Sequence, residues 1–222
     1  MSKPIDLFLF DLAGTVVRDT GFVLRGFQAA AHSLGIDEPD EWYRTRMGVF
    51  KKQVFEELLT KHGMDTSRAD ELVAAFDKAI EQDVRDNGVE RLPGTDESIA
   101  ALADAGVAVG FTTGFGRETA ELVVGSAGLP TDLIVASDEV PRGRPYPDLI
   151  HEAMKRAGVT DAERVGVAGD TPSDVQAGSA AGCGFVVGVG HGSHTLDEIA
   201  PAPHTHLLDD LTTLTGVLGI GR

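Results

Sequence analysis

The sequence predicts an α/β protein with a doubly wound, Rossmann-like parallel sheet as its core and an inserted all-helical cap domain. A short apolar run, Ile5–Phe10, ends abruptly at Asp11, as is typical of a strand buried on both faces. Residues 21–87 show only helical spacing. From Val107 onward, strand-like runs alternate with helical segments, which indicates parallel strands joined by crossover helices. The chain of 222 residues is long enough for a core and a smaller inserted unit.

The insert is expected to contain four helices. In the first, third and fourth segments, apolar residues recur three or four positions apart, whereas the second segment is polar. Glycines close the first and the third. The expected helices span Phe22–Gly35, Asp37–Met47, Val49–His62 and Ser67–Val84. We therefore expect a discontinuous core of residues 1–17 and 90–222 and a cap of residues 18–89. The segments 14–21 and 87–94 are the expected hinges.

The remainder of the chain alternates strands with helices. The expected strands cover residues 107–111, 133–136, 164–168, 185–189 and 206–208, and the expected helices cover 95–105, 117–127 and 148–157, with another beginning at 171. Thr171, Pro172 and Asp174 fit the N-cap, N1 and N3 positions of that last helix. Asp174 is therefore open to two interpretations, as a helix-capping acid or as a support for a functional site.

Charge and cysteine content limit the classes of partner. The formal net charge of −16 argues against nucleic acid and anionic membranes, which are bound through positive charge. Cys183 is the only cysteine, so no intrachain disulfide forms and a reducing cytosol is expected. We expect no signal peptide and no membrane-spanning segment, because the first residues lead directly into a predicted strand and no apolar run is long enough to span a bilayer. We expect a cytoplasmic monomer or homodimer that acts on a small phosphorylated or phosphonate substrate.

Polar residues of related chemistry follow three of the expected strands. Asp11 follows the first, Thr113 the second and Asp170 a later one, and a basic loop contributes Arg144. The carboxyl ends of parallel strands meet at one edge of the sheet, so these side chains should converge. Two carboxylates can share Mg²⁺, and a hydroxyl, backbone N–H groups and a guanidinium can hold phosphoryl oxygens. Asp11 would then be a nucleophile toward phosphorus.

These motifs resemble the haloacid dehalogenase superfamily of hydrolases and, within it, the phosphonatase (phosphonoacetaldehyde hydrolase) branch. The resemblance covers nearly the whole chain. It rests on the segments Phe10–Thr15, Met47–Lys51, Thr112–Glu118, Val140–Pro147 and Gly169–Asp174. It implies that Mg²⁺ is held by Asp11, Asp170 and the backbone carbonyl of Ala13, and that Thr15, Met47 and Gly114 contact the substrate.

Ala13 and Lys51 distinguish between the activities of this superfamily. Ala13 stands where phosphatases usually carry a second Asp that protonates the leaving alcohol, so ester hydrolysis should be slow. Lys51 falls where phosphonatases form a Schiff base with the substrate aldehyde, and a protonated imine can accept the electrons of a breaking C–P bond. The attacking amine needs a lowered pKa, for which Arg44 and Arg46 are candidate neighbours.

The expected function is accordingly Mg²⁺-dependent cleavage of a 2-oxoalkylphosphonate through a lysine Schiff base and an aspartyl-phosphate. Two alternatives stay open: a phosphomonoesterase resembling phosphoglycolate phosphatase, and a non-catalytic binding protein on the same fold. The sequence departs from the phosphonatase pattern at Val54, Gly21 and Phe115, where a His, a Cys and a Tyr are usual. These departures leave open a different 2-oxoalkylphosphonate, or a compound outside that class, as substrate. The pattern His191–His194 is a weak indication of a metal site.

Overall fold

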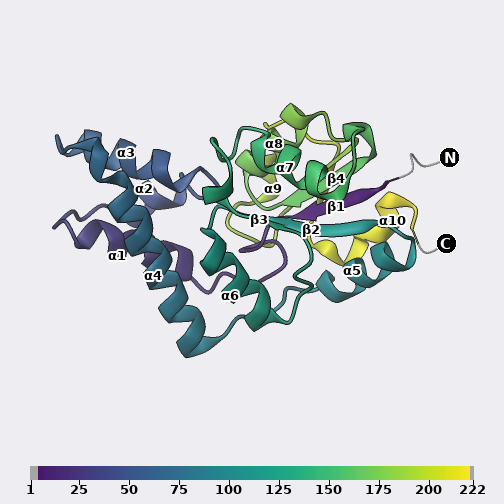
Figure 1. Ribbon diagram of the computed structural model, residues 1–222, viewed down its shortest axis with the longest axis horizontal. Helices are drawn as coiled ribbons and strands as arrows, with labels where there is room; N and C mark the ends of the chain where they lie inside the picture. Colours follow the sequence, from purple (N-terminus) through teal and green to yellow (C-terminus); the bar gives the residue numbers. More distant parts are fainter. Residues whose placement is uncertain (1–4, 221–222) are drawn as a thin grey trace.

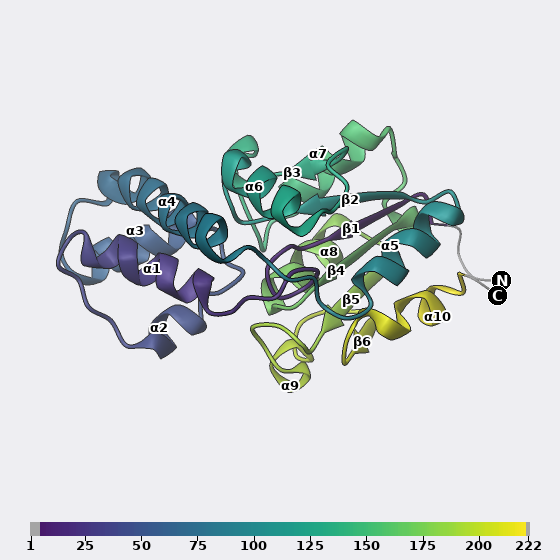
Figure 2. The same ribbon diagram turned by 90° about the horizontal axis from the view of Figure 1, so that it is seen from below.

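The computed structural model describes residues 5–220 and contains a six-stranded parallel sheet with helices on both faces (Figures 1 and 2). The strands are β1 (Leu7–Phe10), β2 (Ala108–Thr112), β3 (Ile134–Val135), β4 (Val165–Gly169), β5 (Phe185–Val189) and β6 (His206–Leu208). Their order in the sheet is β3-β2-β1-β4-β5-β6, and every neighbouring pair is parallel. The predicted fold class is therefore confirmed, and β1 lies in the middle of the sheet.

The register of β1 aligns the ends of three strands. Phe10, the last residue of β1, lies opposite Phe111 of β2 and Ala168 of β4. The residues that follow these positions consequently emerge at one level of the sheet edge. This alignment brings residues that are far apart in the sequence into one site.

Side chains of β1 alternate between two buried faces. Phe8 and Phe10 belong to the core on the face covered by α5 (Thr95–Asp104), α6 (Arg117–Ala127) and α10 (Leu214–Leu218). Leu7 and Leu9 belong to the core under α7 (Asp148–Ala157), α8 (Pro172–Ala181) and α9 (Leu196–Ile199). All four side chains are fully or almost fully buried, as expected for a central strand covered by helices on both sides.

Four helices inserted between β1 and α5 lie beyond the carboxyl ends of the strands (Figures 1 and 2). They are α1 (Phe22–His32), α2 (Asp40–Arg44), α3 (Lys51–Lys61) and α4 (Ala69–Asn87), with a short 3₁₀ turn, η1 (Thr66–Arg68), before α4. An aromatic cluster of Phe27, Tyr43, Phe55 and Phe76 forms their common core. Phe115 of the sheet domain stacks on Phe76 with a centroid distance of 6.3 Å, so the insert packs directly on the core.

Two linkers that run side by side connect the insert to the core. The Arg18 N–H donates to the Glu90 carbonyl at 2.8 Å, and the Leu92 N–H donates to the Val16 carbonyl at 2.9 Å. These bonds fall at the expected boundaries near residues 17 and 90. The division into a core and a cap with those boundaries stays a prediction.

Several predicted elements differ at their ends. The second insert helix is only Asp40–Arg44, and the third begins at Lys51 because Phe50 has an extended backbone with ψ of 121°. The strand expected at 133–136 is reduced to Ile134–Val135. Three 3₁₀ turns, Ser137–Glu139 (η2), Ala162–Arg164 (η3) and Leu211–Thr213 (η4), and the short helices α9 and α10 were not predicted.

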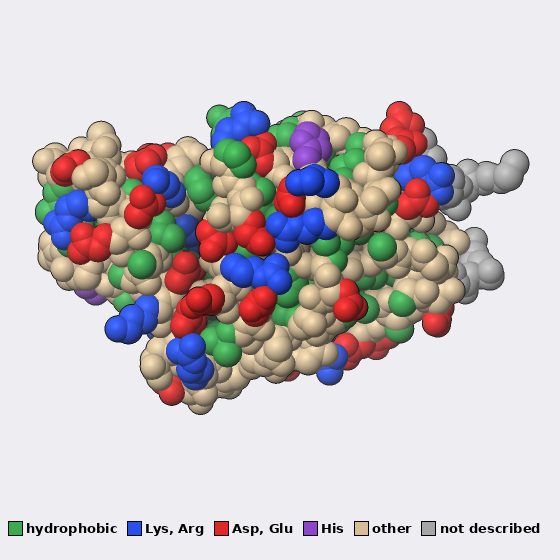
Figure 3. Space-filling view, in the orientation of Figure 1, with side chains coloured by type: hydrophobic (Ala, Val, Ile, Leu, Met, Phe, Trp, Pro, Cys, Tyr) green, Lys and Arg blue, Asp and Glu red, His purple; other side chains and the backbone are tan. Residues whose placement is uncertain are grey.

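Acidic and basic side chains mix at the surface where the insert meets the core, on the face shown in Figure 3. The chain nonetheless carries an excess of acidic residues, with a formal net charge of −16. In residues 5–220, no helix is both long and apolar enough to cross a bilayer.

Candidate active site

Asp11, Thr113 and Asp170 meet at the carboxyl edge of the sheet, as the sequence predicted. Each directly follows the aligned ends of β1, β2 and β4, and each is buried. Backbone bonds fix two of them: the Asp11 N–H donates to the Ala168 carbonyl at 2.9 Å, and the Thr113 N–H donates to the Val135 carbonyl at 3.1 Å. The position of these side chains is therefore set by the sheet itself.

The turn after Asp11 packs against Asp170. Gly14 has a φ of +91°, and a Cβ there would lie 2.3 Å from Asp170 Oδ2, so only glycine fits this position. The Thr15 hydroxyl donates to Asp170 Oδ1 at 3.3 Å, and the Ser193 N–H donates to Oδ2 at 2.6 Å. The predicted substrate residue Thr15 is thus fully buried and holds Asp170 in place.

Arg144 connects two carboxylates under the sheet edge. One guanidinium nitrogen donates to Asp11 Oδ1 at 2.7 Å, and the other forms a short ion pair with Asp174. Asp174 also accepts the Thr171 N–H at 3.0 Å and the Thr171 hydroxyl at 2.6 Å. Asp174 therefore caps α8 and also anchors the Arg144 guanidinium, while its support of a functional site stays a prediction.

Asp170 lies in an environment that disfavours its charged form. Burial, and then the nearby charge of Asp11, raise the pKa of Asp170 to about 6. Two hard carboxylates beside the backbone of Ala13 match the preference of Mg²⁺, which takes few protein ligands and retains water. In residues 5–220, no group of three or more His, Cys, Asp or Glu side chains could hold a metal, so the weak histidine indication receives no support. His191 instead hydrogen-bonds the Thr15 carbonyl at 3.1 Å.

Lys51 is the first residue of α3, and its side chain is buried with 5% exposure. Nζ lies 5.0 Å from the centre of the Phe27 ring and 5.4 Å from that of Phe76. Burial, followed by the charge of Arg144, lowers the pKa of Lys51 to about 8. The positive end of the α3 dipole acts in the same direction. The amine therefore has the properties of a nucleophile rather than of a solvated surface charge.

The expectation that Arg44 or Arg46 would be the neighbouring cation is wrong. Arg44 pairs with Glu198 at 3.0 Å and with Glu41 at 2.9 Å, and Arg46 pairs with Glu57 at 3.0 Å. These arginines precede α3, and their side chains reach other partners. The cation that acts on the amine comes from the core, almost a hundred residues further along the chain.

Lys51 and Asp11 line the same small cavity, of about 40 Å³. The other residues around it include Ala13, Met47, Gly114, Arg144 and Asp170. Gly114 leaves space beside the amine, since a Cβ there would lie 3.5 Å from Nζ. All of the predicted site residues except Thr15 and Asp174 border this cavity. Thr15 hydrogen-bonds Asp170 and Asp174 pairs with Arg144, both of which line the cavity.

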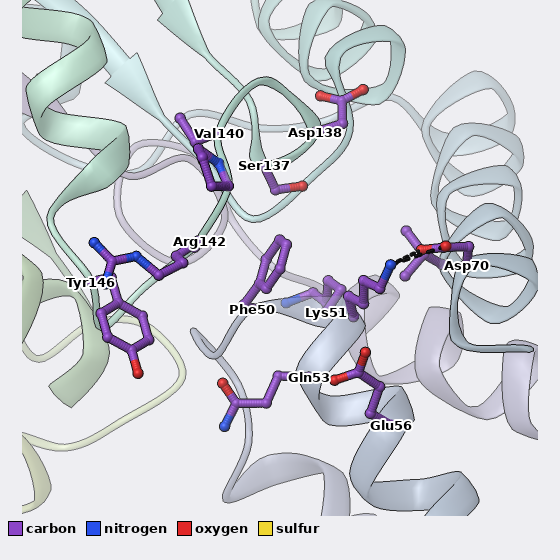
Figure 4. Close-up of a pocket in the computed structure, with 14 residues that line it drawn as sticks. Phe50, Lys51, Gln53, Glu56, Asp70, Ser137, Asp138, Val140, Arg142 and Tyr146 are labelled. Atoms are coloured by element: carbon purple, nitrogen blue, oxygen red, sulfur yellow. Dashed lines mark hydrogen bonds and ion pairs between the residues drawn. The ribbon is translucent and has the colours of Figure 1, made fainter. Parts of the chain in front are cut away.

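A larger groove of about 680 Å³ borders the outer side of α3 (Figure 4). Lys51 lines both this groove and the small cavity. Phe50, the residue before Lys51, packs against the loop of the core that contains Gly143. A Cβ on Gly143 would lie 2.5 Å from the Phe50 ring. The groove therefore lies on the border between the insert and the core, next to the amine.

A family model described as haloacid dehalogenase-like hydrolase matches residues 8–188. The chain belongs to this family. It is 32% identical over 208 residues to a phosphonoacetaldehyde hydrolase of Bacillus cereus, covering 86% of this chain and 78% of the relative. A hydrolase from Pseudomonas syringae shares the fold with a TM-score of 0.86 at 23% identity, over 96% of this chain and 98% of that one.

The fold also extends to relatives with other names. A predicted phosphoglycolate phosphatase from Haemophilus somnus superposes with a TM-score of 0.78 at 17% identity, over 96% of this chain and 97% of that one. The predicted resemblance to the haloacid dehalogenase hydrolases and their phosphonatase branch is confirmed, and the chain is an enzyme of the hydrolase class.

Sequence reasoning missed two residues beside the site of this haloacid dehalogenase-like hydrolase. Ser193 holds Asp170 through its backbone N–H, a contact that does not depend on the type of side chain. Asp77 lies on α4 and accepts the Gly116 N–H at 3.4 Å, but in the sequence it is one of many acids on a polar helix face. No local pattern distinguishes either residue.

Proposed function

We propose that this protein is a phosphonatase that cleaves the C–P bond of a 2-oxoalkylphosphonate such as phosphonoacetaldehyde. The observation that supports this proposal most strongly is the buried Lys51 amine, whose pKa falls to about 8, in one cavity with Asp11. A surface lysine on a solvated helix would have neither property. The relative from Bacillus cereus, which is named for this activity, adds support along most of the chain.

In the proposed reaction, the neutral Lys51 amine attacks the substrate carbonyl, and loss of water gives a protonated imine. Asp11 then attacks phosphorus, and the electrons of the C–P bond enter the imine to give an enamine and an aspartyl-phosphate. Protonation and hydrolysis of the enamine return Lys51 and release the aldehyde. Water hydrolyses the aspartyl-phosphate and releases phosphate.

Three residues would hold the phosphonate group. The Thr113 hydroxyl and the N–H of Gly114 lie at the end of β2 and can donate to its oxygens. Arg144 is buried and already paired with Asp11, so it can place a fixed positive charge beside the nucleophile. Mg²⁺ held by Asp11, Asp170 and the Ala13 carbonyl would neutralise charge on the phosphonate.

We further propose that the helices α1–α4 act as a cap, residues 18–89, over a core of residues 1–17 and 90–222. The Phe50 N–H donates to the Arg144 carbonyl at 3.3 Å, and Arg44 pairs with Glu198 at 3.0 Å, so the two parts are in contact around the cavity. Closure would exclude water from the imine and enamine. Glycines with positive φ, Gly21 and Gly88 among them, lie in the proposed hinges.

The proposal is tested by measuring phosphate and acetaldehyde released from phosphonoacetaldehyde by the wild-type protein with Mg²⁺ and with a chelator. Release should require Mg²⁺ and should be lost in Lys51→Arg. Lys52→Arg is the matched control, because the Lys52 side chain is only partly buried and pairs with Asp70 at 2.8 Å. If wild-type protein with Mg²⁺ releases no phosphate, or if Lys51→Arg is as active as Lys52→Arg, the proposal is wrong.

The same variants separate C–P cleavage from ester hydrolysis. Ala13 offers no acid for a leaving alcohol, so phosphoglycolate and other alkyl phosphates should be poor substrates. Efficient hydrolysis of such an ester that survives Lys51→Arg would favour a phosphomonoesterase.

A further inference from the structure

Asp77 is a half-buried carboxylate at the border between insert and core that the reaction above does not use. It lies on α4, and its Oδ1 accepts the Gly116 N–H at 3.4 Å, immediately before α6 begins. Burial raises the pKa of Asp77 to about 6, while the hydrogen bond from the Gly116 N–H and the charge of Lys51 oppose the shift. The negative charge of Asp138 raises the pKa further.

Asp77 and Lys51 approach the same turn of the core from two different helices. A Cβ on Gly114 would lie 3.5 Å from Lys51 Nζ, and a Cβ on Gly116 would lie 2.9 Å from Asp77 Oδ2. The ring of Phe76, which precedes Asp77 in α4, lies 5.4 Å from the same Nζ. The amine and the carboxylate are therefore close enough for each charge to shift the pKa of the other.

The other nearby carboxylates already have defined partners. Among the described residues, Asp11, Asp77 and Asp19 are the carboxylates whose charge acts most strongly on Lys51. Asp11 is the proposed nucleophile and pairs with Arg144. Asp19 accepts the N–H groups that open α1, at 2.8 and 3.3 Å. Val54, one turn after Lys51, is apolar and fully buried.

We propose that Asp77 is the acid–base partner of Lys51 in forming the imine, an inference that rests on the function proposed above. Addition of the amine to the carbonyl gives a carbinolamine. The protonated Asp77 then donates its proton, directly or through one water, to the carbinolamine hydroxyl. The C–O bond breaks, water leaves, and the nitrogen lone pair forms the C=N bond. Asp77 is left as a carboxylate facing the new iminium cation, and the reverse transfer assists hydrolysis.

The test compares Asp77→Asn with Glu81→Gln. Asn keeps the shape of the side chain and can still accept the Gly116 N–H, so the variant is expected to fold, which circular dichroism checks. Glu81 lies one turn further along α4 and accepts the Thr119 hydroxyl at 3.2 Å, so its substitution also removes a carboxylate between insert and core. Two readouts are compared: the pH profile of kcat for phosphonoacetaldehyde, and the rate of trapping by cyanoborohydride.

Asp77→Asn should lower kcat by about 100-fold, as expected for loss of an acid–base group, with little change in KM. It should also slow trapping by cyanoborohydride. The wild-type profile of kcat against pH should bend near 6, where Asp77 titrates, and we call this bend the limb. Asp77→Asn should lack the limb, whereas Glu81→Gln should keep the wild-type profile. Asp77→Glu, which retains a carboxylic acid, should retain that limb. These results together would establish the role.

Other results would contradict the inference. If Asp77 only links the insert to α6, Asp77→Asn keeps the wild-type pH profile and the wild-type trapping rate, as Glu81→Gln does. An Asp77→Glu variant that folds and lacks the limb is also contrary to the inference. Wild-type protein that forms no trapped adduct contradicts the proposed function itself, and this result is distinct from an adduct that forms equally fast in Asp77→Asn.

Discussion

Burial moves the pKa values of Lys51 and Asp170 in opposite directions, because in each case it disfavours the charged form. The pKa of Lys51 falls to about 8, and that of Asp170 rises to about 6. Near neutral pH, Lys51 would then be a neutral amine, as attack on a carbonyl requires, in about one tenth of the protein molecules. An ordinary lysine has a pKa about two units higher, so a far smaller fraction of its amine would be neutral at the same pH.

Imine formation on Lys51 should therefore depend on pH in a defined way. The amine becomes neutral as pH rises through its pKa of about 8. In Asp77→Asn, which removes the second titrating group, adduct formation with cyanoborohydride should therefore increase across this range and be half-maximal near it. Quantitative mass spectrometry of the adduct at a series of pH values measures this midpoint. A midpoint near that of a free lysine, about 10, would show that burial does not activate the amine.

Ala13 provides a second test based on a single residue. In Ala13→Asp, a carboxylic acid returns to the position from which phosphatases protonate a leaving alcohol, so hydrolysis of alkyl phosphates should rise at least about tenfold. p-Nitrophenyl phosphate, whose leaving group needs no proton, is the control substrate and should change much less. Equal effects on both substrates would argue against this interpretation of Ala13.

The N-terminus of α8 combines a helix cap with the support of the active site. Asp174 accepts two hydrogen bonds from Thr171 and pairs with the buried Arg144. Helix α9 has a similar capping box, in which the Thr195 hydroxyl pairs with Glu198 at 2.9 Å, but it is exposed. These two helices therefore allow capping to be separated from the burial of an ion pair.

Asp174→Ala should destabilise the protein by about 3 kcal/mol or more, because it leaves the buried Arg144 without one of its carboxylates. Thr195→Ala removes only an exposed cap and should cost about 1 kcal/mol or less. Urea unfolding compares the two, and phosphate release should fall in Asp174→Ala alone. Similar small losses of stability in both variants would mean that the Arg144 pair contributes nothing beyond capping.

The convergence of the site was predictable wherever it follows from strand order. Asp11, Thr113 and Asp170 could be placed together because parallel strands end at one edge. The position of Lys51 could be inferred only through the family resemblance, because no rule of spacing places the start of α3 over that edge. Asp77 was missed for the same reason, since its partner Gly116 belongs to a distant element.

The errors at helix ends also have local causes. Phe50 is extended, so the apolar pattern starting at Val49 did not mark the start of α3. α9 is a single turn, although its Thr195 and Glu198 form a capping box that the sequence contained. Short elements of this kind depend on tertiary packing more than on periodicity.

Insert and core must approach closely for Lys51 to reach Asp11. Gly48 lies at this border with a φ of +81°, and a Cβ there would lie 2.2 Å from the Thr171 hydroxyl oxygen. Gly35 also has a positive φ, +72°, but no heavy atom lies within 4 Å of a Cβ at that position. The two glycines share the same type of backbone strain and differ only in what a side chain would meet.

Gly48→Ala should consequently lose at least about tenfold in phosphate release, because a small misplacement of groups that must meet is costly. Gly35→Ala should remain active and lose about 1 to 2 kcal/mol of stability from the left-handed backbone. Steady-state kinetics and urea unfolding measure the two effects. If Gly48→Ala were as active as Gly35→Ala, close approach at Gly48 would not be required for the reaction.

The most direct measurement of the central claim is to trap the reaction of phosphonoacetaldehyde with borohydride and locate the adduct by peptide mass spectrometry. The proposed mechanism predicts a reduced adduct on Lys51, none on the neighbouring Lys52, and loss of phosphate release in proportion to the adduct formed. Phosphate release by an enzyme that carries no adduct at Lys51, or equal labelling of Lys51 and Lys52, would contradict it.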